Sequence, residues 1–308
     1  MVLLRVAAAT LAGSMCLAIL LPDAMANRRP CLELEQKYAQ IESYADWNQV
    51  NRTLTSAARL GCVALAERLL EKDASLGTRD GLGRQPLTHA ATEGRAEIVT
   101  LLLDKGAPID ARSLDGSTAL FKAAENGRVE IVRILVERGA NVNLPGRSGV
   151  MPVAAAAYMG SEPIVRYLIE QGADAHNVDG TQKSALVYAA GRGFPPVARL
   201  LLDHGVDVNA RYGHGLTALM WAAGHSSDAG SRDIVEVINL LVDRGARLDD
   251  QDDRGRTALM IAAELDHRAP AEALLARGAD PTLKDKQGKT ASDLTSLTSL
   301  RAKLAAKP

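Results

Sequence analysis

The stretch Gly224–Asp233, GHSSDAGSRD, places one histidine, three serines and two aspartates within ten residues. These are the residue types of a nucleophile, a general base and an orienting acid. Serine triads, however, are assembled from distant segments that are held rigidly beside an oxyanion hole, and a short turn supplies neither feature. We interpret Ser231 as a helix N-cap and Asp233 as an acid in the first turn. The stretch therefore predicts no catalysis, and the protein is expected not to be an enzyme.

Metal binding is the second kind of chemistry that these side chains could support. His214 and His225 lie in one region with Asp228, but the six histidines form neither H-x₃-H nor H-E-x-x-H, and no C-x₂-C pair occurs. The glycines in Asp80–Gly83 follow no predicted buried strand, so they indicate a turn and not a phosphate loop. We predict no metal site and no cofactor.

Composition and charge narrow the class of partner. The chain has 308 residues and a net charge of −1, and its basic and acidic residues are interspersed. A basic face is therefore not evident, and nucleic acid or an anionic membrane surface is not an expected partner. Aromatic residues make up only 3% of the chain. Small side chains must then fill a core between closely spaced helices.

A repeat organises most of the chain. GRQPLTHAATEGRAEIVTLLLDKGAPID from Gly83 aligns with GSTALFKAAENGRVEIVRILVERGANVN from Gly116, and further copies start at Gly149 and Gln182. Two glycines recur in each copy with a spacing of 33 residues, at Gly94, Gly127, Gly160 and Gly193, and at Gly106, Gly139, Gly172 and Gly205. A fixed period of this length is the mark of a stacked repeat array.

The unit resembles the ankyrin repeat, whose signature is T-P-L-H-x-A at this period. The resemblance covers about Asn51 to Pro308 and implies an all-α solenoid of helix–turn–helix units with short β-hairpin-like fingers, about eight units including caps. Each unit carries an Ala-Ala pair where two helices approach closely. Residues 27–50 are expected to form an N-terminal capping segment, with Leu34, Tyr38 and Ile41 at helical spacing.

One interval breaks the period. Leu219 and Leu259 occupy equivalent positions but lie 40 residues apart, so seven extra residues fall between Ala223 and Val235. We expect an expanded turn that lengthens the second helix of its unit by about one helical turn. The insertion is a candidate for a partner-specific protrusion.

Residues 1–26 have the three parts of a secretory signal peptide: an early Arg5, an apolar run from Val6 to Leu21, and Ala24-Met25-Ala26 as a cleavage site. An uncleaved membrane anchor is the alternative, although the run is shorter than the ~20 residues that a spanning helix needs. We expect cleavage after Ala26, a periplasmic or secreted mature protein, and no membrane association after cleavage.

Cleavage would leave two cysteines, Cys31 and Cys62. In an exported chain they could form a disulfide that ties the capping segment to the first repeat. Two free thiols are the alternative.

The resemblance implies a binding function, because ankyrin arrays usually contact protein partners through finger tips and the exposed ends of first helices. Carried over to this chain, those positions include Leu82, Leu114, Arg147 and Lys183. We select as the protein-binding set Tyr158, Met159, Arg192, Arg211, Tyr212, His214, Leu216 and His225.

We expect a monomeric, exported interaction module or scaffold for an unidentified protein. Two alternatives remain: a periplasmic assembly or stress factor that supports a partner enzyme, and an enzyme with an unrecognised site, which His225→Ala and Ser227→Ala would test. For the selected residues, the alternative is that they are ordinary solvated side chains. Loss of one enzyme's activity in a deletion strain would favour the assembly factor.

Overall fold

The computed structural model describes residues 21–224 and 231–305, which form α-helices joined by turns. The bounds of the helices are α1 Leu21–Ala39, α2 Trp47–Leu60, α3 Val63–Glu71, α4 Pro86–Glu93, α5 Ala96–Asp104, α6 Ala119–Glu125, α7 Val129–Glu137, α8 Pro152–Tyr158, α9 Glu162–Glu170, α10 Ala185–Gly191, α11 Pro195–Asp203, α12 Ala218–Gly224, α13 Ser231–Asp243, α14 Ala258–Glu264, α15 Arg268–Ala276, α16 Ala291–Leu294 and α17 Thr298–Ala305. Short 3₁₀ turns, η1 and η2, span Arg147–Gly149 and Gly213–Gly215.

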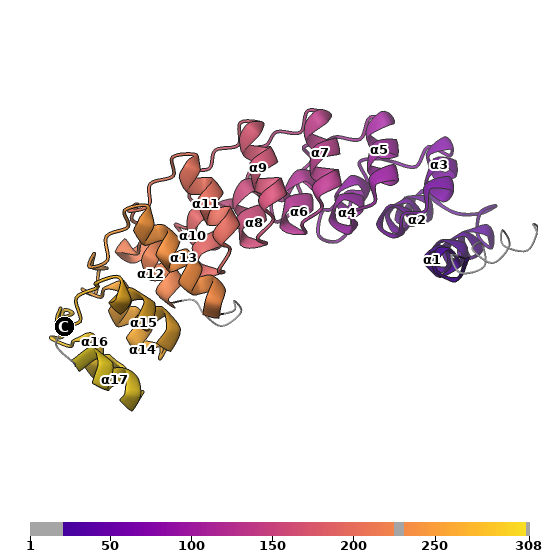
Figure 1. Cartoon of the computed structure of the whole chain (residues 1–308). Coiled ribbons are helices and arrows are strands. Elements are labelled where there is room, and N and C mark those ends of the chain that lie inside the picture. The colour runs from indigo at the N-terminus through magenta and orange to yellow at the C-terminus, as the bar shows by residue number, and fades with distance from the viewer. Residues whose placement is uncertain (1–20, 225–230, 306–308) are drawn as a thin grey trace, which may run out of the picture.

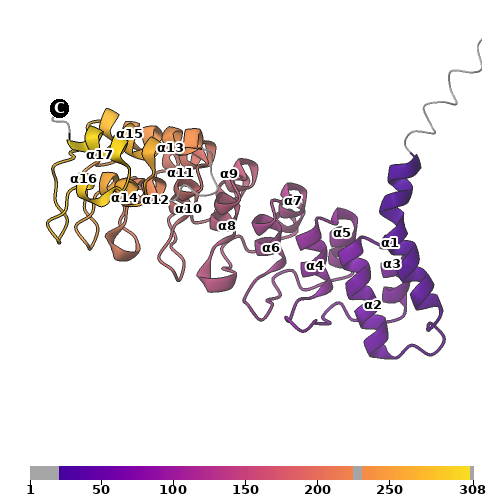
Figure 2. The same cartoon turned by 90° about the horizontal axis from the view of Figure 1, so that it is seen from below.

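From α2 onward, the helices of the described ranges form eight consecutive pairs. The first helix of each pair packs against the first helix of the next, as α4 does against α6 and α6 against α8. Figure 1 shows the resulting arc, with these first helices on its inner side and α5, α7 and α9 on its outer side. The connecting fingers project from one edge of the array (Figure 2). This architecture confirms the predicted all-α solenoid.

The core runs along the array between the two layers of helices. The Ala-Ala pairs are completely buried, for example Ala90-Ala91 and Ala189-Ala190, which lets neighbouring helices approach closely. In α5, Ile98, Val99 and Leu102 are also completely buried. A single unit has too little surface to bury these side chains alone, so stacking supplies the hydrophobic stabilisation.

The fingers are held by hydrogen bonds from backbone N–H groups to aspartate side chains within turns. Asp179 Oδ1 accepts hydrogen bonds from the backbone N–H groups of Thr181 and Lys183. The same Asx-turn recurs around Asp80, whose Oδ1 accepts from the N–H groups of Leu82 and Arg84. The described residues contain no β-strand, and isolated antiparallel bridges join Val178 to Ser184 and Tyr212 to Leu216.

The capping segment lies against the first repeat through α1. Tyr38 is only 2% exposed, and Cys31 and Cys62 are joined as a disulfide with Cα atoms 5.4 Å apart. The helix α2 begins at Trp47, four residues before the expected start of the array. Residues 1–20 of the predicted leader lie outside the described residues. Its last six residues, 21–26, belong to α1.

Within the described ranges, no helix combines the length and hydropathy that a membrane span requires.

The inserted stretch is described only in part. Residues 225–230, including His225, lie outside the described residues. The helix α13 that follows has 13 residues, whereas α11 and α15 have 9 each, so the second helix of this unit is longer by about one turn, as predicted. The helix α13 begins at Ser231, the residue that we predicted at this helix start.

Candidate functional site

The predicted binding residues fall on two neighbouring parts of the array. Tyr158 ends α8 and Met159 follows it, and their exposed fractions are 42% and 44%. Arg192 follows α10. The remaining described members belong to the finger between α11 and α12, namely Arg211, Tyr212, His214 and Leu216.

A hollow of about 210 Å³ opens beside Tyr158. Its cause is Ala155, which occupies the helix position that Lys122 fills one unit earlier and Tyr188 fills one unit later. A methyl group is much shorter than either side chain, so the space between the neighbours stays open. The hollow is lined by Phe121, Glu125, Arg147, Ser148, Val150, Ala155, Tyr158, Asp179, Thr181, Lys183 and Tyr188.

Two of the predicted residues touch each other at this hollow. The guanidinium carbon of Arg192 lies 4.5 Å from the centroid of the Tyr158 ring, and Arg192 Nη1 donates a hydrogen bond of 3.3 Å to the Tyr158 hydroxyl. The Tyr158 ring also meets Tyr188 edge to face, with centroids 5.6 Å apart. A cation–π contact at an exposed site is worth ~0.5–1 kcal/mol. These contacts hold the Tyr158 ring in place before any partner arrives.

The finger that precedes α10 holds the Tyr188 side chain. Its hydroxyl donates a hydrogen bond to the Asp179 carboxylate. Burial raises the pKa of Tyr188, and the bond to Asp179 raises it further. Burial alone would also raise the pKa of Asp179, but the hydrogen bonds from Tyr188 and Thr181 outweigh this effect and lower it. The phenol therefore stays protonated and the carboxylate charged, which locks the orientation of the ring.

Positive charges flank the aromatic rings. Lys183 Nζ lies 5.0 Å from the Trp221 ring centroid and 5.9 Å from that of Tyr188. On the opposite side, Arg147 Nη2 lies 2.8 Å from Glu125 Oε1. The hollow is thus an aromatic surface bordered by charged groups, which suits a side chain with an apolar body and a polar end.

The finger of Arg211–Leu216 serves partly to hold the array together. Arg211 Nη1 donates a hydrogen bond of 2.8 Å to the backbone oxygen of Gln251 in the next finger. Tyr212 is half-buried, and burial raises its pKa. His214 is exposed at a backbone φ of 63°. Of the predicted set, Tyr158, Met159, Arg211 and His214 are exposed and Arg192 is half-buried, while Arg211 also stabilises the fold.

Sequence reasoning did not select Tyr188, Trp221 and Asp179. The signal for the two aromatic residues lies in the register, since Tyr188 and Trp221 occupy the same position of successive units. Arg147 and Lys183 belonged to the wider set of finger positions but were not selected. Their convergence on one hollow depends on how adjacent units stack.

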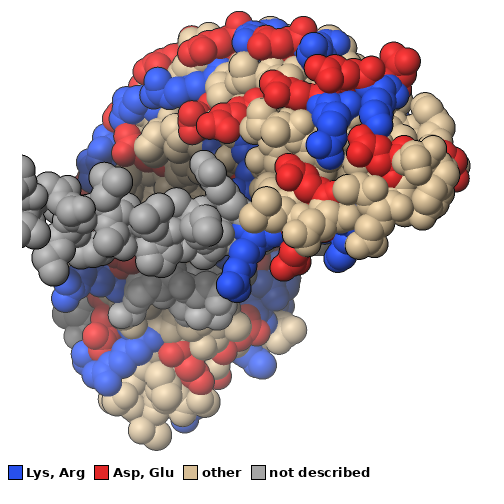
Figure 3. Space-filling model, turned by 90° about the vertical axis from the view of Figure 1, so that its right-hand side faces the viewer, with Lys and Arg blue, Asp and Glu red and all other residues tan. Residues whose placement is uncertain are grey.

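The arrangement is suited to binding. Among the residues that the structure describes, no group of three His, Cys, Asp or Glu side chains is placed to hold a metal ion. On the end of the array that faces the viewer in Figure 3, basic and acidic side chains are mingled over the outer surface. This mingling agrees with the near-neutral net charge.

Comparisons with known proteins agree with the fold. The family model for ankyrin repeats (three copies) matches residues 54–146, 153–238 and 214–285. The crystal structure of the human ASB11 ankyrin repeat domain is similar, with 26% sequence identity and a TM-score of 0.64 over 74% of this chain and 98% of that chain. A search of the curated proteins gave no match. Since the family model covers well over half of its length, the chain belongs to the ankyrin-repeat family.

Proposed function

We propose that this protein is an exported, non-enzymatic interaction module that binds a protein partner through the inner face of its array. Ankyrin repeats imply protein–protein interaction. The hollow beside Tyr158 is the observation that supports the proposed position of the binding site. Tyrosine and arginine are the residue types that most often dominate interface energies, and here Tyr158 and Arg192 are in contact. Met159, beside them, adds an exposed and adaptable apolar side chain.

Preorganisation supports the same proposal. The rings of Tyr158 and Tyr188 and the side chain of Arg192 already hold one another, so a partner would lose little conformational entropy in ordering them. The helices that carry these side chains are held in place because each unit packs on its neighbours.

Export is the second part of the proposal. Its support is the leader pattern of residues 1–26 together with the pairing of Cys31 and Cys62, because disulfides persist in oxidising compartments such as the periplasm. We propose a periplasmic or secreted monomer. Light scattering would measure its molar mass in solution directly.

Site-specific photocrosslinking tests the binding face. A photoreactive amino acid placed at Met159 should give a discrete cross-linked protein in the source cells. The pair Tyr158→Ala and Arg192→Ala should abolish that adduct, because both anchors of the hollow are lost.

A matched control exists on the outer layer. Tyr167 on α9 lies under Arg133 of α7, with the guanidinium carbon 5.3 Å from the ring centroid, so this pair repeats the same chemistry on another face. The substitutions Tyr167→Ala and Arg133→Ala should leave the adduct unchanged. Equal loss from both pairs would contradict a role for the inner face.

A further inference from the structure

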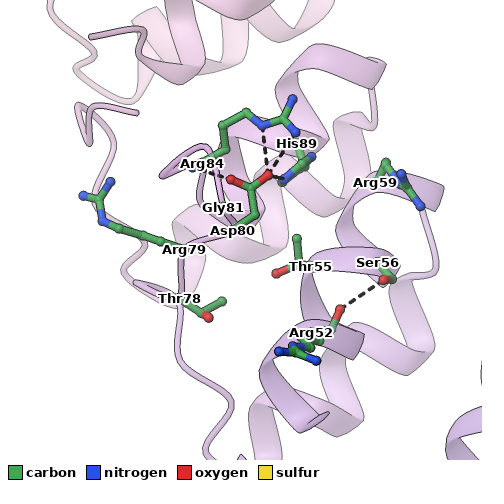
Figure 4. A pocket seen from close by; sticks show the side chains of 10 residues that line it. All are labelled: Arg52, Thr55, Ser56, Arg59, Thr78, Arg79, Asp80, Gly81, Arg84 and His89. Carbon is green, nitrogen blue, oxygen red and sulfur yellow. Dashed lines mark hydrogen bonds and ion pairs between the residues drawn. The ribbon is translucent and has the colours of Figure 1, made fainter. Parts of the chain in front are cut away.

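A second cavity lies at the N-terminal end of the array and is lined largely by basic side chains. Its volume is about 510 Å³. One wall is α2, and the other is the finger that leads into α4 (Figure 4). The lining consists of Arg52, Thr55, Ser56, Arg59, Thr78, Arg79, Asp80, Gly81, Arg84 and His89.

This cavity is the counterpart of the hollow beside Tyr158. In the 33-residue register, Ser56 stands at the position of Ala155, and Arg59 stands at the position of Tyr158. In both places a short side chain on a first helix leaves space that the adjacent finger borders. The basic cavity therefore opens on the same inner face as the proposed binding site.

The cavity holds positive charge that the protein itself does not neutralise. Arg52 and Arg59 are exposed, and within the described part of the chain no hydrogen bond or ion pair holds either guanidinium. Arg79 Nη1 donates hydrogen bonds to the backbone oxygens of Gly83 and Arg112, and its guanidinium is turned away from Arg52 and Arg59 (Figure 4). In a chain with a net charge of −1, two uncompensated guanidinium groups beside one cavity are a local concentration of positive charge.

The cavity's single carboxylate is already engaged. Asp80 accepts hydrogen bonds from the backbone N–H groups of Leu82 and Arg84, and Arg84 Nη2 lies 2.9 Å from its Oδ2. His89 Nε2 lies 3.0 Å from the same oxygen. Burial lowers the pKa of His89. Asp80 thus compensates Arg84 and orients a neutral His89, and the charges of Arg52 and Arg59 remain available to a ligand.

The next hollow along the face adds an apolar surface. It has a volume of about 360 Å³ and shares Arg84 with the basic cavity. Leu82 and Leu114, in its lining, are 58% and 79% exposed, and the backbone N–H of Leu114 donates to the Leu82 oxygen. A peptide could place carboxylates in the cavity and methylene groups on these leucines, whereas an inorganic anion would use the cavity alone.

We propose that the cavity bordered by Arg52 and Arg59 binds the carboxylates of an acidic peptide segment of the protein partner. This inference rests on the proposed function, because it names the chemistry of the partner at one end of the same face. Guanidinium groups bind carboxylates through paired, charge-assisted hydrogen bonds, and two of them on one helix can hold two acidic residues of a peptide.

Fluorescence anisotropy with a labelled hexaglutamate peptide tests the proposal on the full mature chain. The peptide should bind, a hexaglutamine peptide of the same length should not, and added salt should weaken binding steeply. The double variant Arg52→Gln, Arg59→Gln should weaken hexaglutamate by about tenfold or more, because two charge-assisted contacts are lost.

The matched control removes two charges elsewhere. Arg199 on α11 and Arg232 on α13 are exposed on second helices, so Arg199→Gln with Arg232→Gln should change the affinity less than about twofold. Equal weakening by both double variants would show a general charge effect and overturn the proposal. Displacement of hexaglutamate by inorganic phosphate at equal concentration would overturn it in favour of a free-anion site.

The two proposals can fail separately. Absence of hexaglutamate binding while the Met159 adduct persists would remove the acidic-peptide assignment and leave the proposed binding face intact. Binding of hexaglutamate that is sensitive to Arg52 and Arg59, with no adduct at Met159, would support the cavity assignment and count against the wider face.

Discussion

At the scale of single residues, Phe121 and Gly146 explain how one finger differs from the others. Gly146 stands in the register where Asp80 and Asp179 form Asx-turns in their own fingers. A Cβ atom on Gly146 would lie 2.5 Å from the Phe121 ring, which is itself only 1% exposed. The ring thus occupies the place of a finger side chain, and it forms one wall of the hollow beside Tyr158.

We therefore expect Gly146→Ala to destabilise the protein by about 1–3 kcal/mol, because the ring or the finger must move to admit the methyl group. Gly81→Ala is the control: a Cβ there would meet nothing within 4 Å, so the free energy of unfolding should change by less than about 0.5 kcal/mol. Denaturant unfolding measures both. Equal stability of the two variants would contradict the packing argument.

Asp266 gives a second prediction at this scale. Its carboxylate accepts hydrogen bonds of 2.7 Å from Thr295 Oγ1 and 2.9 Å from the backbone N–H of Ser296. Hydrogen bonds from the Ser296 and Thr295 side chains lower the pKa of Asp266 from 3.8 to about 2. Since the pKa of the folded state lies below that of the unfolded state, this stabilisation is present above about pH 4 and is lost as the pH falls to about 2.

Asp266→Asn removes this carboxylate while keeping a residue type that tolerates its backbone φ of 57°. The variant should have a lower Tm than the wild type at neutral pH, and the difference should shrink between pH 4 and pH 2. Thermal unfolding followed by circular dichroism across that range measures it. A difference in Tm that is constant with pH would show that the charge of Asp266 does not matter.

At the scale of elements, the disulfide between Cys31 and Cys62 joins α1 to the start of α3 across a sequence separation of 31. In a repeat array each unit contacts only its neighbours, so a change at one end acts locally. The double substitution Cys31→Ser, Cys62→Ser should lower the free energy of unfolding by about 2–4 kcal/mol, mainly because α1 detaches from the first repeat more readily.

Hydrogen exchange can locate that loss. Amides of α1 and α2 should exchange faster in the double variant, while those of α8 to α11 should not change. A free-thiol count of two on denatured, unreduced mature protein would show that the bond is absent. Uniformly faster exchange along the whole array would contradict local docking.

The inserted stretch before α13 is the second feature at this scale. Replacing residues 224–234 by Glu-Asn-Gly-Arg, the residues of Glu125–Arg128, removes seven residues and restores the period of 33. The array should stay folded, with a loss of about 1.5–3 kcal/mol because the completely buried Ile234 is removed. Circular dichroism and denaturant unfolding test this. Collapse of the helical signal would mean that the insertion is structural.

At the scale of the whole molecule, the proposed export bears on the disulfide, because disulfides persist in oxidising compartments. Cleavage after Ala26 would leave a mature chain that starts at Asn27 and keeps Cys31. N-terminal sequencing of protein from the periplasmic fraction should therefore read from Asn27. An intact Met1 in a cytosolic fraction would refute export.

The sequence by itself determined the array. Its 33-residue register predicted the helix pairs, the buried alanines and the longer helix α13, because each of these depends on local periodicity and on contacts between adjacent units. The same register placed Asp73 where later units have glycine, and Asp73 has a φ of 59° in the structure. A repeated backbone repeats its conformation even where the residue type changes.

Only the tertiary structure decided what the inner face offers. Ala155 lies in the lining of a hollow, and Arg52 and Arg59 border a cavity together with the finger of the next unit, because side chains from different units meet there. Arg211, selected as a binding residue, proved to tie two fingers together. Such convergence depends on the stacking of the units and on individual side-chain conformations. Periodicity along the chain encodes neither quantity, which is why the fold followed from the sequence and the site did not.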